Sequence, residues 1–178
     1  MVIHIDFTLL IFFFFATAIR LVSLIISVKN EKKLKRGNAV EYGIKNSKVL
    51  VLCHTFFYLS CMGESILLKK QFNNIFFLGG VGLFIFSMIM LSIVIISLKG
   101  MWTVKLIIAP VLKINTSFIF KYFRHPNYFL NIIPELVSIS LICQAWFTLS
   151  IGLPLYFIPL AIRIVQEEKL MKKHFSNY

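Results

Sequence analysis

The sequence has few charged residues and very few acidic ones. Of its 178 residues only 15% are charged, and seven Asp and Glu stand against nineteen Lys and Arg, which gives a net charge of +12. Soluble domains are usually about 25% charged, so the composition excludes an ordinary water-soluble enzyme. Hydrophobic residues make up 58% of the chain, Phe alone occurs 19 times, and the mean hydropathy is +0.84. This composition predicts an integral membrane protein.

Cysteine is also scarce. The three cysteines stand in apolar stretches, without a C-x-x-C pair or a cluster with histidine, so neither a disulfide framework nor a metal site is indicated. A strongly basic chain often binds nucleic acid. Here the cations are not interleaved with exposed aromatic residues, and we expect no nucleic-acid binding. Cationic loops beside membrane spans account better for the charge.

The hydrophobic residues form five long runs. A helix needs about 20 apolar residues to cross a bilayer core of about 30 Å. The runs are continuously apolar, whereas the strands of a membrane β-barrel alternate. The sequence therefore predicts an all-α integral membrane protein with a single membrane domain over residues 1–178. The predicted spans cover residues 7–28, 49–68, 75–98, 128–143 and 147–165.

The segments between the predicted spans differ in charge. The loops after spans one and three and the C-terminal segment 166–178 together hold fifteen Lys and Arg, against two in the other loops. The positive-inside rule then predicts an external N-terminus and a cytosolic C-terminus in the cytoplasmic membrane. The segment 99–127 is moderately apolar, carries spaced cations and contains Pro110 and Pro126. We expect it to lie along the cytosolic interface, where a soluble cofactor can reach it.

Several polar residues fall inside the predicted spans, where an ionisable group costs about 2.5 kcal/mol or more and is a candidate for function. Spans four and five each carry such residues on one helical face: Tyr128, Asn131, Glu135 and Ser138 in the first, and Tyr156, Arg163 and Glu167 in the second. A structural alternative is an ion pair, such as Glu135 with Arg163, that only holds the hairpin together. We expect Arg20, His54 and Glu64 to make polar contacts within the bundle.

Two motifs near the C-terminus resemble a known family. RHPNY (Arg124–Tyr128), a hydrophobic hairpin and then R-x-x-x-E-E (Arg163, Glu167 and Glu168) resemble the C-terminal signature of the isoprenylcysteine carboxyl methyltransferase family. Three upstream pieces resemble its small bacterial members, so the resemblance covers nearly the whole chain. They are NEK (Asn30–Lys32), AVEYG (Ala39–Gly43) and WTVK (Trp102–Lys105).

The resemblance implies a membrane methyltransferase that uses S-adenosylmethionine and a lipophilic acceptor. Arg163 would bind the acceptor and act in catalysis with Glu167, while Glu135 would be either structural or a base. Phe118 and Phe120 depart from the family, which usually has a glycine and an aromatic hydroxyl at these places. By matching position, the cofactor-binding residues would be Leu112, Lys113, Ile114, Asn115, Phe120, His125, Pro126, Asn127, Tyr128 and Glu167.

The sequence leaves the chemical identity of the methyl acceptor open. Family membership suggests a prenylcysteine-like carboxylate, and the resemblance to bacterial members suggests an alkylated polyketide pyrone or resorcinol, which makes O-methylation the leading function. The nearest alternative enzyme is a phospholipid N-methyltransferase. A third possibility is a non-catalytic membrane assembly subunit, whose polar residues serve only helix association. The expected partners are a lipophilic small molecule and membrane lipids.

Overall fold

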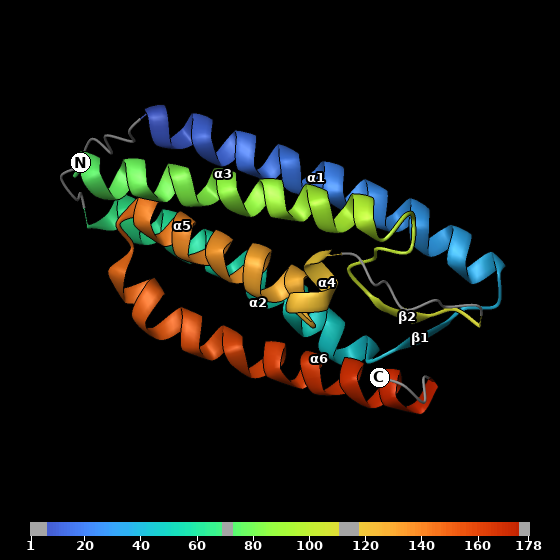
Figure 1. Ribbon diagram of the computed structural model, residues 1–178. Helices are drawn as coiled ribbons and strands as arrows, with labels where there is room; N and C mark the ends of the chain where they lie inside the picture. Colours follow the sequence, from blue (N-terminus) through green and yellow to red (C-terminus); the bar gives the residue numbers. More distant parts are fainter. Residues whose placement is uncertain (1–6, 69–72, 111–117, 175–178) are drawn as a thin grey trace.

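The computed structural model describes residues 7–68, 73–110 and 118–174, and Figure 1 shows them as a bundle of long helices. The helices are α1 (Phe7–Arg36), α2 (Ile44–Leu67), α3 (Asn74–Ser97), α4 (Phe118–Tyr122), α5 (Ile133–Cys143) and α6 (Leu153–His174). Two π-helical turns, η1 (Asn127–Ile132) and η2 (Thr148–Gly152), lead into α5 and α6. Two short strands, β1 (Val40–Tyr42) and β2 (Leu106–Ile108), complete the described elements.

Four helices are long and apolar enough to cross a membrane: Ile11–Arg36, Ile44–Leu67, Asn74–Ser97 and Thr148–His174. Asn127–Cys143 is a shorter apolar helix. These five confirm the prediction of an all-α integral membrane protein. The first and last helices continue past the predicted ends, residues 28 and 165. Hydropathy did not mark these final turns as helix, because they are cationic. Lys and Arg suit a helix C-terminus, where the helix dipole is negative.

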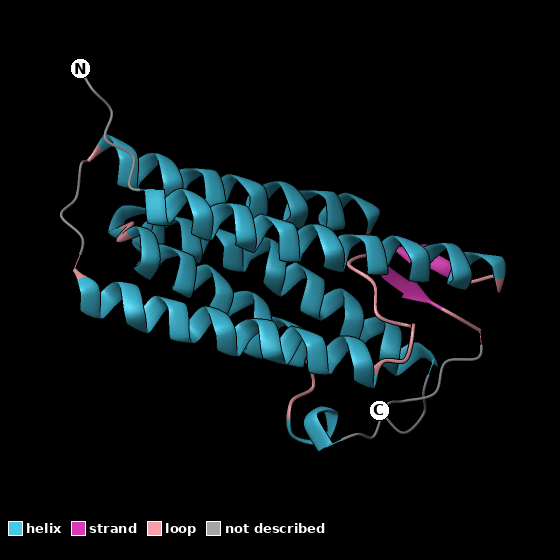
Figure 2. Ribbon diagram, turned by 90° about the horizontal axis from the view of Figure 1, so that it is seen from above, coloured by secondary structure: helices cyan, strands magenta, loops and turns pink. Residues whose placement is uncertain are grey.

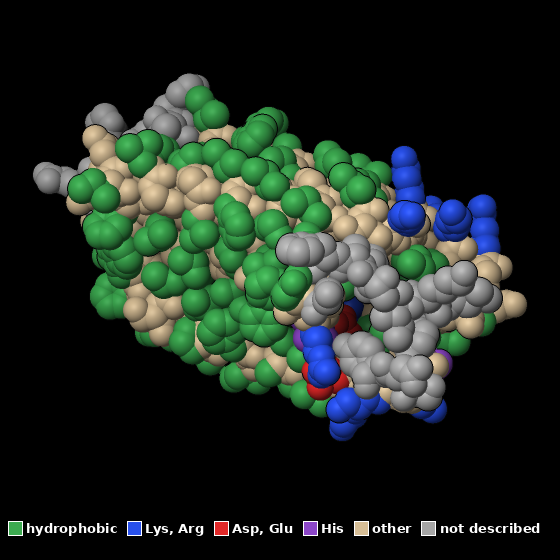
Figure 3. Space-filling model, in the orientation of Figure 1, with side chains coloured by type: hydrophobic (Ala, Val, Ile, Leu, Met, Phe, Trp, Pro, Cys, Tyr) green, Lys and Arg blue, Asp and Glu red, His purple; other side chains and the backbone are tan. Residues whose placement is uncertain are grey.

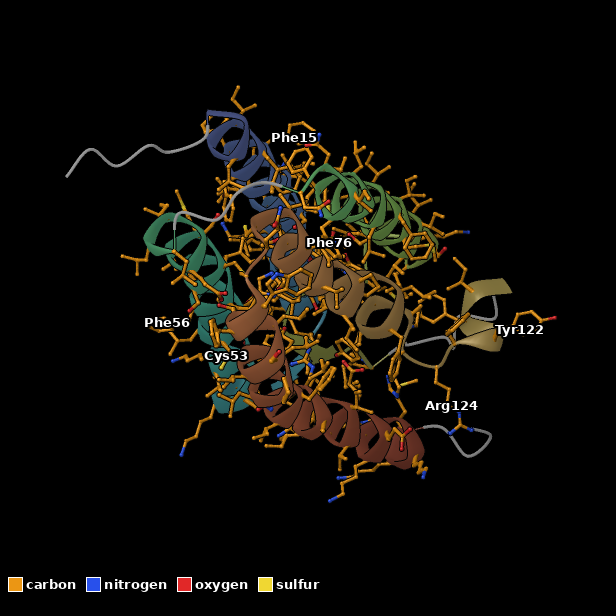
Figure 4. All side chains as sticks on the ribbon, turned by 90° about the vertical axis from the view of Figure 1, so that its left-hand side faces the viewer. Phe15, Cys53, Phe56, Phe76, Tyr122 and Arg124 are labelled. Carbon is orange, nitrogen blue, oxygen red and sulfur yellow. The ribbon has the colours of Figure 1, made fainter. Side chains whose placement is uncertain are left out.

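The shorter helix, α5, forms the centre of the bundle. It packs against α3 and α2, and α6 also packs against α2. The side chains of Leu136, Ile139 and Ile142 on α5 are fully buried. The outer surface is apolar instead: Phe15 on α1 and Phe56 on α2, labelled in Figure 4, are both more than half exposed. A surface of this kind suits a lipid environment.

A close approach of α3 to α5 depends on glycine. A Cβ added at Gly80 would lie 2.7 Å from Ile142 Cγ1 and 3.0 Å from the Ser138 carbonyl oxygen, whereas Gly79 and Gly82 face open space. Small residues let membrane helices pack closely. The G-G-V-G sequence in α3 is therefore a packing feature at Gly80.

The two strands lie at one end of the bundle, beside the end of α1 (Figures 1 and 2). They pair antiparallel, with Glu41 opposite Ile107, and we call this end of the bundle the strand end. The sequence did not predict them, because three-residue strands are too short to give a periodic signal. Figure 3 shows hydrophobic side chains over most of the bundle and Lys and Arg gathered at the strand end.

Candidate functional site

A cavity of about 500 Å³ lies among α1, α2, α6 and the segments 101–108 and 124–128. Its size is that of a typical small-molecule site, about 300–1,000 Å³. Two groups of polar side chains line this cavity or lie next to it. The strand-end group consists of His125, Tyr128, Arg163 and Glu167, and the deep group, further into the bundle, consists of Arg20, His54, Tyr58, Glu135 and Tyr156.

Arg163 is the centre of the strand-end group and is only 3% exposed. Its Nε donates to Glu167 Oε1 at 3.1 Å and to the Tyr128 hydroxyl at 3.2 Å. Nη1 donates to Ser47 Oγ at 2.7 Å, and Nη2 donates to the Val104 carbonyl at 3.1 Å. Arg163 thus connects α6 to α2, to η1 and to the segment before β2. Its side chain also lines the cavity.

His125 and Tyr128 meet Glu167 from the start of η1. The Tyr128 hydroxyl donates to Glu167 Oε1, and His125 Nδ1 lies 3.2 Å from Glu167 Oε2. The other ring nitrogen of His125 lies 3.5 Å from Glu168 Oε1. Burial lowers the pKa of His125, but the hydrogen bonds and charges of Glu167 and Glu168 outweigh it, so the pKa of His125 is raised. The cationic imidazolium is therefore favoured between the two carboxylates.

The local sequence explains why these side chains converge. Pro126 precedes η1, where a proline costs no helical hydrogen bond, and the His125 carbonyl accepts from the N–H groups of Tyr128 and Phe129. Pro134 then lies in the first turn of α5. A proline has no N–H to continue the regular hydrogen-bond ladder, and the turn before it is π-helical. The wider turn places Tyr128 against the His125 ring, with centroids 5.8 Å apart.

The structure brings together four of the residues that the sequence singled out, His125, Tyr128, Arg163 and Glu167. Three more, Phe120, Pro126 and Asn127, also line the cavity. Leu112, Lys113, Ile114 and Asn115 lie outside the described residues. Glu135 does not lie with these candidate site residues. It belongs to the deep group and is not among the described residues that line the cavity.

Glu135 pairs with Arg20 and not with Arg163, so the hypothetical hairpin ion pair is not the one that forms. Both oxygens of Glu135 contact the Arg20 guanidinium, and the Tyr58 hydroxyl donates to the same carboxylate. Glu135 is fully buried. The pair joins α1 to α5 inside the membrane-spanning part of the bundle, which agrees with the expectation that Arg20 is paired there.

His54 and Glu64, the other polar residues of the second predicted span, have separate surroundings. His54 Nε2 lies 3.9 Å from Glu135 Oε1, and the His54 ring lies 6.0 Å from that of Tyr156. Glu64 accepts from the backbone N–H groups of Phe147 at 3.1 Å and of Thr148 at 2.8 Å. Glu64 thus caps the helical turn that leads into α6.

Trp102 is a cavity residue that the sequence analysis did not assign. It is 4% exposed and lines the cavity, and its Nε1–H has no hydrogen-bond partner among the described residues. Asn30 Nδ2 donates to the Trp102 carbonyl at 2.8 Å, and the Lys105 ammonium bonds Glu31 at 2.7 Å. The NEK and WTVK motifs therefore meet each other, a pairing that their separation in the sequence conceals.

Comparisons with known proteins agree with these motifs. Residues 80–173 match the family model of the isoprenylcysteine carboxyl methyltransferase (ICMT) family. An uncharacterized protein of Haemophilus influenzae is 48% identical over 160 residues, which cover 90% of this chain and 92% of that protein. The uncharacterized protein YpbQ of Bacillus subtilis is 26% identical over 155 residues, 87% of this chain and 91% of its own length. No solved structure matches the chain. The family match covers more than half of the sequence, and the chain belongs to the isoprenylcysteine carboxyl methyltransferase family of membrane methyltransferases.

Proposed function

We propose that the protein transfers a methyl group from S-adenosylmethionine to an oxygen atom of a lipophilic acceptor. The observation that carries this proposal is the strand-end group, because its ionisable residues border a cavity that continues between membrane-spanning helices. A reaction between a water-soluble donor and a lipid-soluble acceptor needs a site that both can enter. The strand-end group has that position.

The residues present fit S-adenosylmethionine. The donor carries an ammonium, ribose hydroxyls and an adenine ring, and when bound it supplies an electrophilic methyl group on a sulfonium sulfur. The Glu167 carboxylate would accept hydrogen bonds from the ammonium or the hydroxyls. Trp102 adds a buried indole N–H without a partner among the described residues, and His125 and Tyr128 add a stacked pair of rings. These groups suit a polar ligand with an aromatic portion.

Arg163 favours an oxygen acceptor over an amine. A guanidinium binds a carboxylate or phenolate by charge-assisted hydrogen bonds, and its positive charge stabilises the deprotonated acceptor. A guanidinium has only N–H donors and cannot accept a hydrogen bond from the N–H groups of an amine, which argues against phospholipid N-methylation. Both a prenylcysteine-like carboxylate and an alkylated pyrone or resorcinol meet this requirement. Most of the acceleration would come from alignment of the two reactants.

The proposal includes an orientation in the membrane. With the strand end in the cytosol, the soluble donor reaches the strand-end group directly and the C-terminus is cytosolic. The gathering of Lys and Arg at this end supports that orientation. The acceptor would then come from the bilayer, along the part of the cavity that α1 and α2 line.

Titration of the detergent-purified protein with S-adenosylmethionine in a calorimeter tests the proposal. We expect binding, and we expect His125→Ala and Tyr128→Phe each to weaken it at least fivefold. His174→Ala and Tyr122→Phe are matched controls, because these side chains are exposed and neither residue lines the cavity. If folded wild-type protein gives neither heat nor a melting shift at saturating donor, the methyltransferase function is wrong for this chain. The non-catalytic assembly subunit would then be the better interpretation.

A further inference from the structure

The deep group presents polar atoms to the cavity at the level of the membrane spans. Arg20, His54 and Tyr156 all line the cavity. Two Arg20 nitrogens, Nε and Nη2, contact Glu135. His54 Nε2 is buried and has no hydrogen-bond partner among the described residues. These side chains surround the part of the cavity that α1, α2 and α6 form.

Helix association accounts for only part of this group. Glu135 is already neutralised by Arg20 and hydrogen-bonded by Tyr58, so the ion pair is complete without His54 or Tyr156. The 3.9 Å between His54 Nε2 and Glu135 Oε1 is longer than a hydrogen bond. A polar group left without a partner in the interior of a membrane protein is costly. A ligand atom in the cavity would remove that cost.

The helical repeat gives the separation of the two polar groups. Ser47 on α2 contacts Arg163 on α6, and His54 and Tyr156 face each other two turns further along the same helices. Two turns span about 10 Å of helix axis. Side chains lean toward the N-terminus of their own helix, so His54 and Arg163 lean toward each other along the bundle, whereas Tyr156 leans away from Arg163. The two polar groups therefore stay about two helical turns, or roughly 10 Å, apart. A ring with one oxygen on each side, and a hydrogen bond of about 2.9 Å at each oxygen, can span a gap of this size.

We propose that the deep group is a second acceptor-binding subsite that recognises a neutral oxygen. The proposed ligand carries two oxygens on one small head: a reacting oxygen at Arg163, and a carbonyl, hydroxyl or ring oxygen that bonds Arg20, His54 and Tyr156. The second oxygen is neutral because Glu135 already balances the charge of Arg20. This inference rests on the proposed function and adds to it, because it favours acceptors with two oxygens on the head over monofunctional lipids.

Two commercial lipids that differ by one hydroxyl test the subsite. 5-Pentadecylresorcinol and 3-pentadecylphenol share the alkyl chain and one phenol, and only the first has a second oxygen. We would titrate each into the full-length protein in detergent and measure the dissociation constants. We expect the resorcinol to bind at least tenfold more tightly than the phenol. In Tyr156→Phe and in His54→Leu this preference should fall below threefold through weaker binding of the resorcinol, with phenol binding retained.

Tyr42→Phe is the matched control, because Tyr42 lies in β1 and is not among the described residues that line the cavity. It should keep the full preference. Equal binding of the two lipids to the wild type, failure of the resorcinol to bind, or an unchanged preference in both folded variants would each overturn the subsite. Titration of the same samples with S-adenosylmethionine separates the two proposals. A protein that binds the donor but does not distinguish the lipids retains the proposed function and lacks the subsite.

Discussion

Replacing Arg163 by lysine is the sharpest test of the strand-end group, because it keeps the charge and removes the fork. Arg163 bonds four partners from three nitrogens. A lysine ammonium at this position can still pair with Glu167 one turn away. A single nitrogen on an unbranched chain cannot also reach Ser47 and the Val104 carbonyl, which lie on the other side of the guanidinium.

The structure gives the size of the effect. A hydrogen bond from a charged donor contributes about 1.5–3 kcal/mol. The bonds to Ser47 and Val104 are both lost, and both residues line the cavity, where water can replace part of each bond. We therefore take the lower value for each and expect the free energy of unfolding of Arg163→Lys to fall by about 3 kcal/mol. Loss of the planar fork should also lower methylation per folded molecule at least tenfold, which is about 1.4 kcal/mol of transition-state stabilisation.

The assay measures donor affinity, methylation rate and melting temperature on the same preparations. The acceptor is whichever of a farnesylated cysteine and 5-pentadecylresorcinol the wild-type protein methylates faster. If Arg163 serves the acceptor, the donor dissociation constant changes by less than about threefold, or roughly 0.7 kcal/mol. Glu167→Gln should show the reverse, with donor binding affected most. Arg36→Lys, at the exposed end of α1, is the control. A donor affinity that falls as far as turnover in Arg163→Lys would refute the acceptor role.

Four further predictions concern other parts of the chain. The folded-state pKa of His125 is raised. Its stabilising contribution is therefore complete below its unfolded pKa of about 6.5 and is lost as pH rises through the raised value. The difference in melting temperature between the wild type and His125→Asn should shrink over that range. Asn30→Ala removes a hydrogen bond to the Trp102 carbonyl, worth about 1 kcal/mol, and calorimetry should show donor affinity falling about fivefold. Gly43→Ala forces a Cβ into a residue with φ of 59° and toward a side chain of α6, and should cost about 1–2 kcal/mol in thermal unfolding. A cysteine at Ser176, in a background without the native cysteines, should resist an impermeant thiol reagent in intact cells, and strong labelling would reverse the proposed orientation.

The fold was predictable to the extent that it depends on hydrophobicity. Five apolar runs gave five main helices, because a membrane-spanning segment must satisfy its own backbone hydrogen bonds. The helix ends were less predictable. Residues 29–36 look like a loop by charge, yet they continue α1, since hydropathy marks where a helix leaves the apolar phase and not where it ends. The pairing of β1 with β2 depends on contacts between segments far apart in the chain, which no local pattern records.

The candidate site was predictable where its residues share a helical face or a motif. Tyr156, Arg163 and Glu167 have a common face of α6, and the structure places all three at or beside the cavity. The partner of Glu135 was not predictable in the same way. Two cations, Arg20 and Arg163, lie within the predicted membrane spans, and helical spacing says nothing about which helix faces which. Only the assembled bundle puts Arg20 of α1 beside Glu135 of α5.

The pairing of Glu135 with Arg20 separates a structural ion pair from the arginine of the candidate site, and the sequence alone could not distinguish these two roles. Because Glu135 pairs with Arg20, the partner of Arg163 is Glu167 at the strand end, where both side chains line the cavity. Had Glu135 paired with Arg163, Arg20 would have been left unpaired within a membrane span at a cost of about 2.5 kcal/mol or more. Arg20→Gln should therefore destabilise the bundle, because it leaves Glu135 as an unpaired buried charge. The double variant Arg20→Gln with Glu135→Gln removes both charges together and should regain most of the lost thermal stability. If the double variant melts no higher than Arg20→Gln alone, the ion pair does not carry the structural role assigned to it.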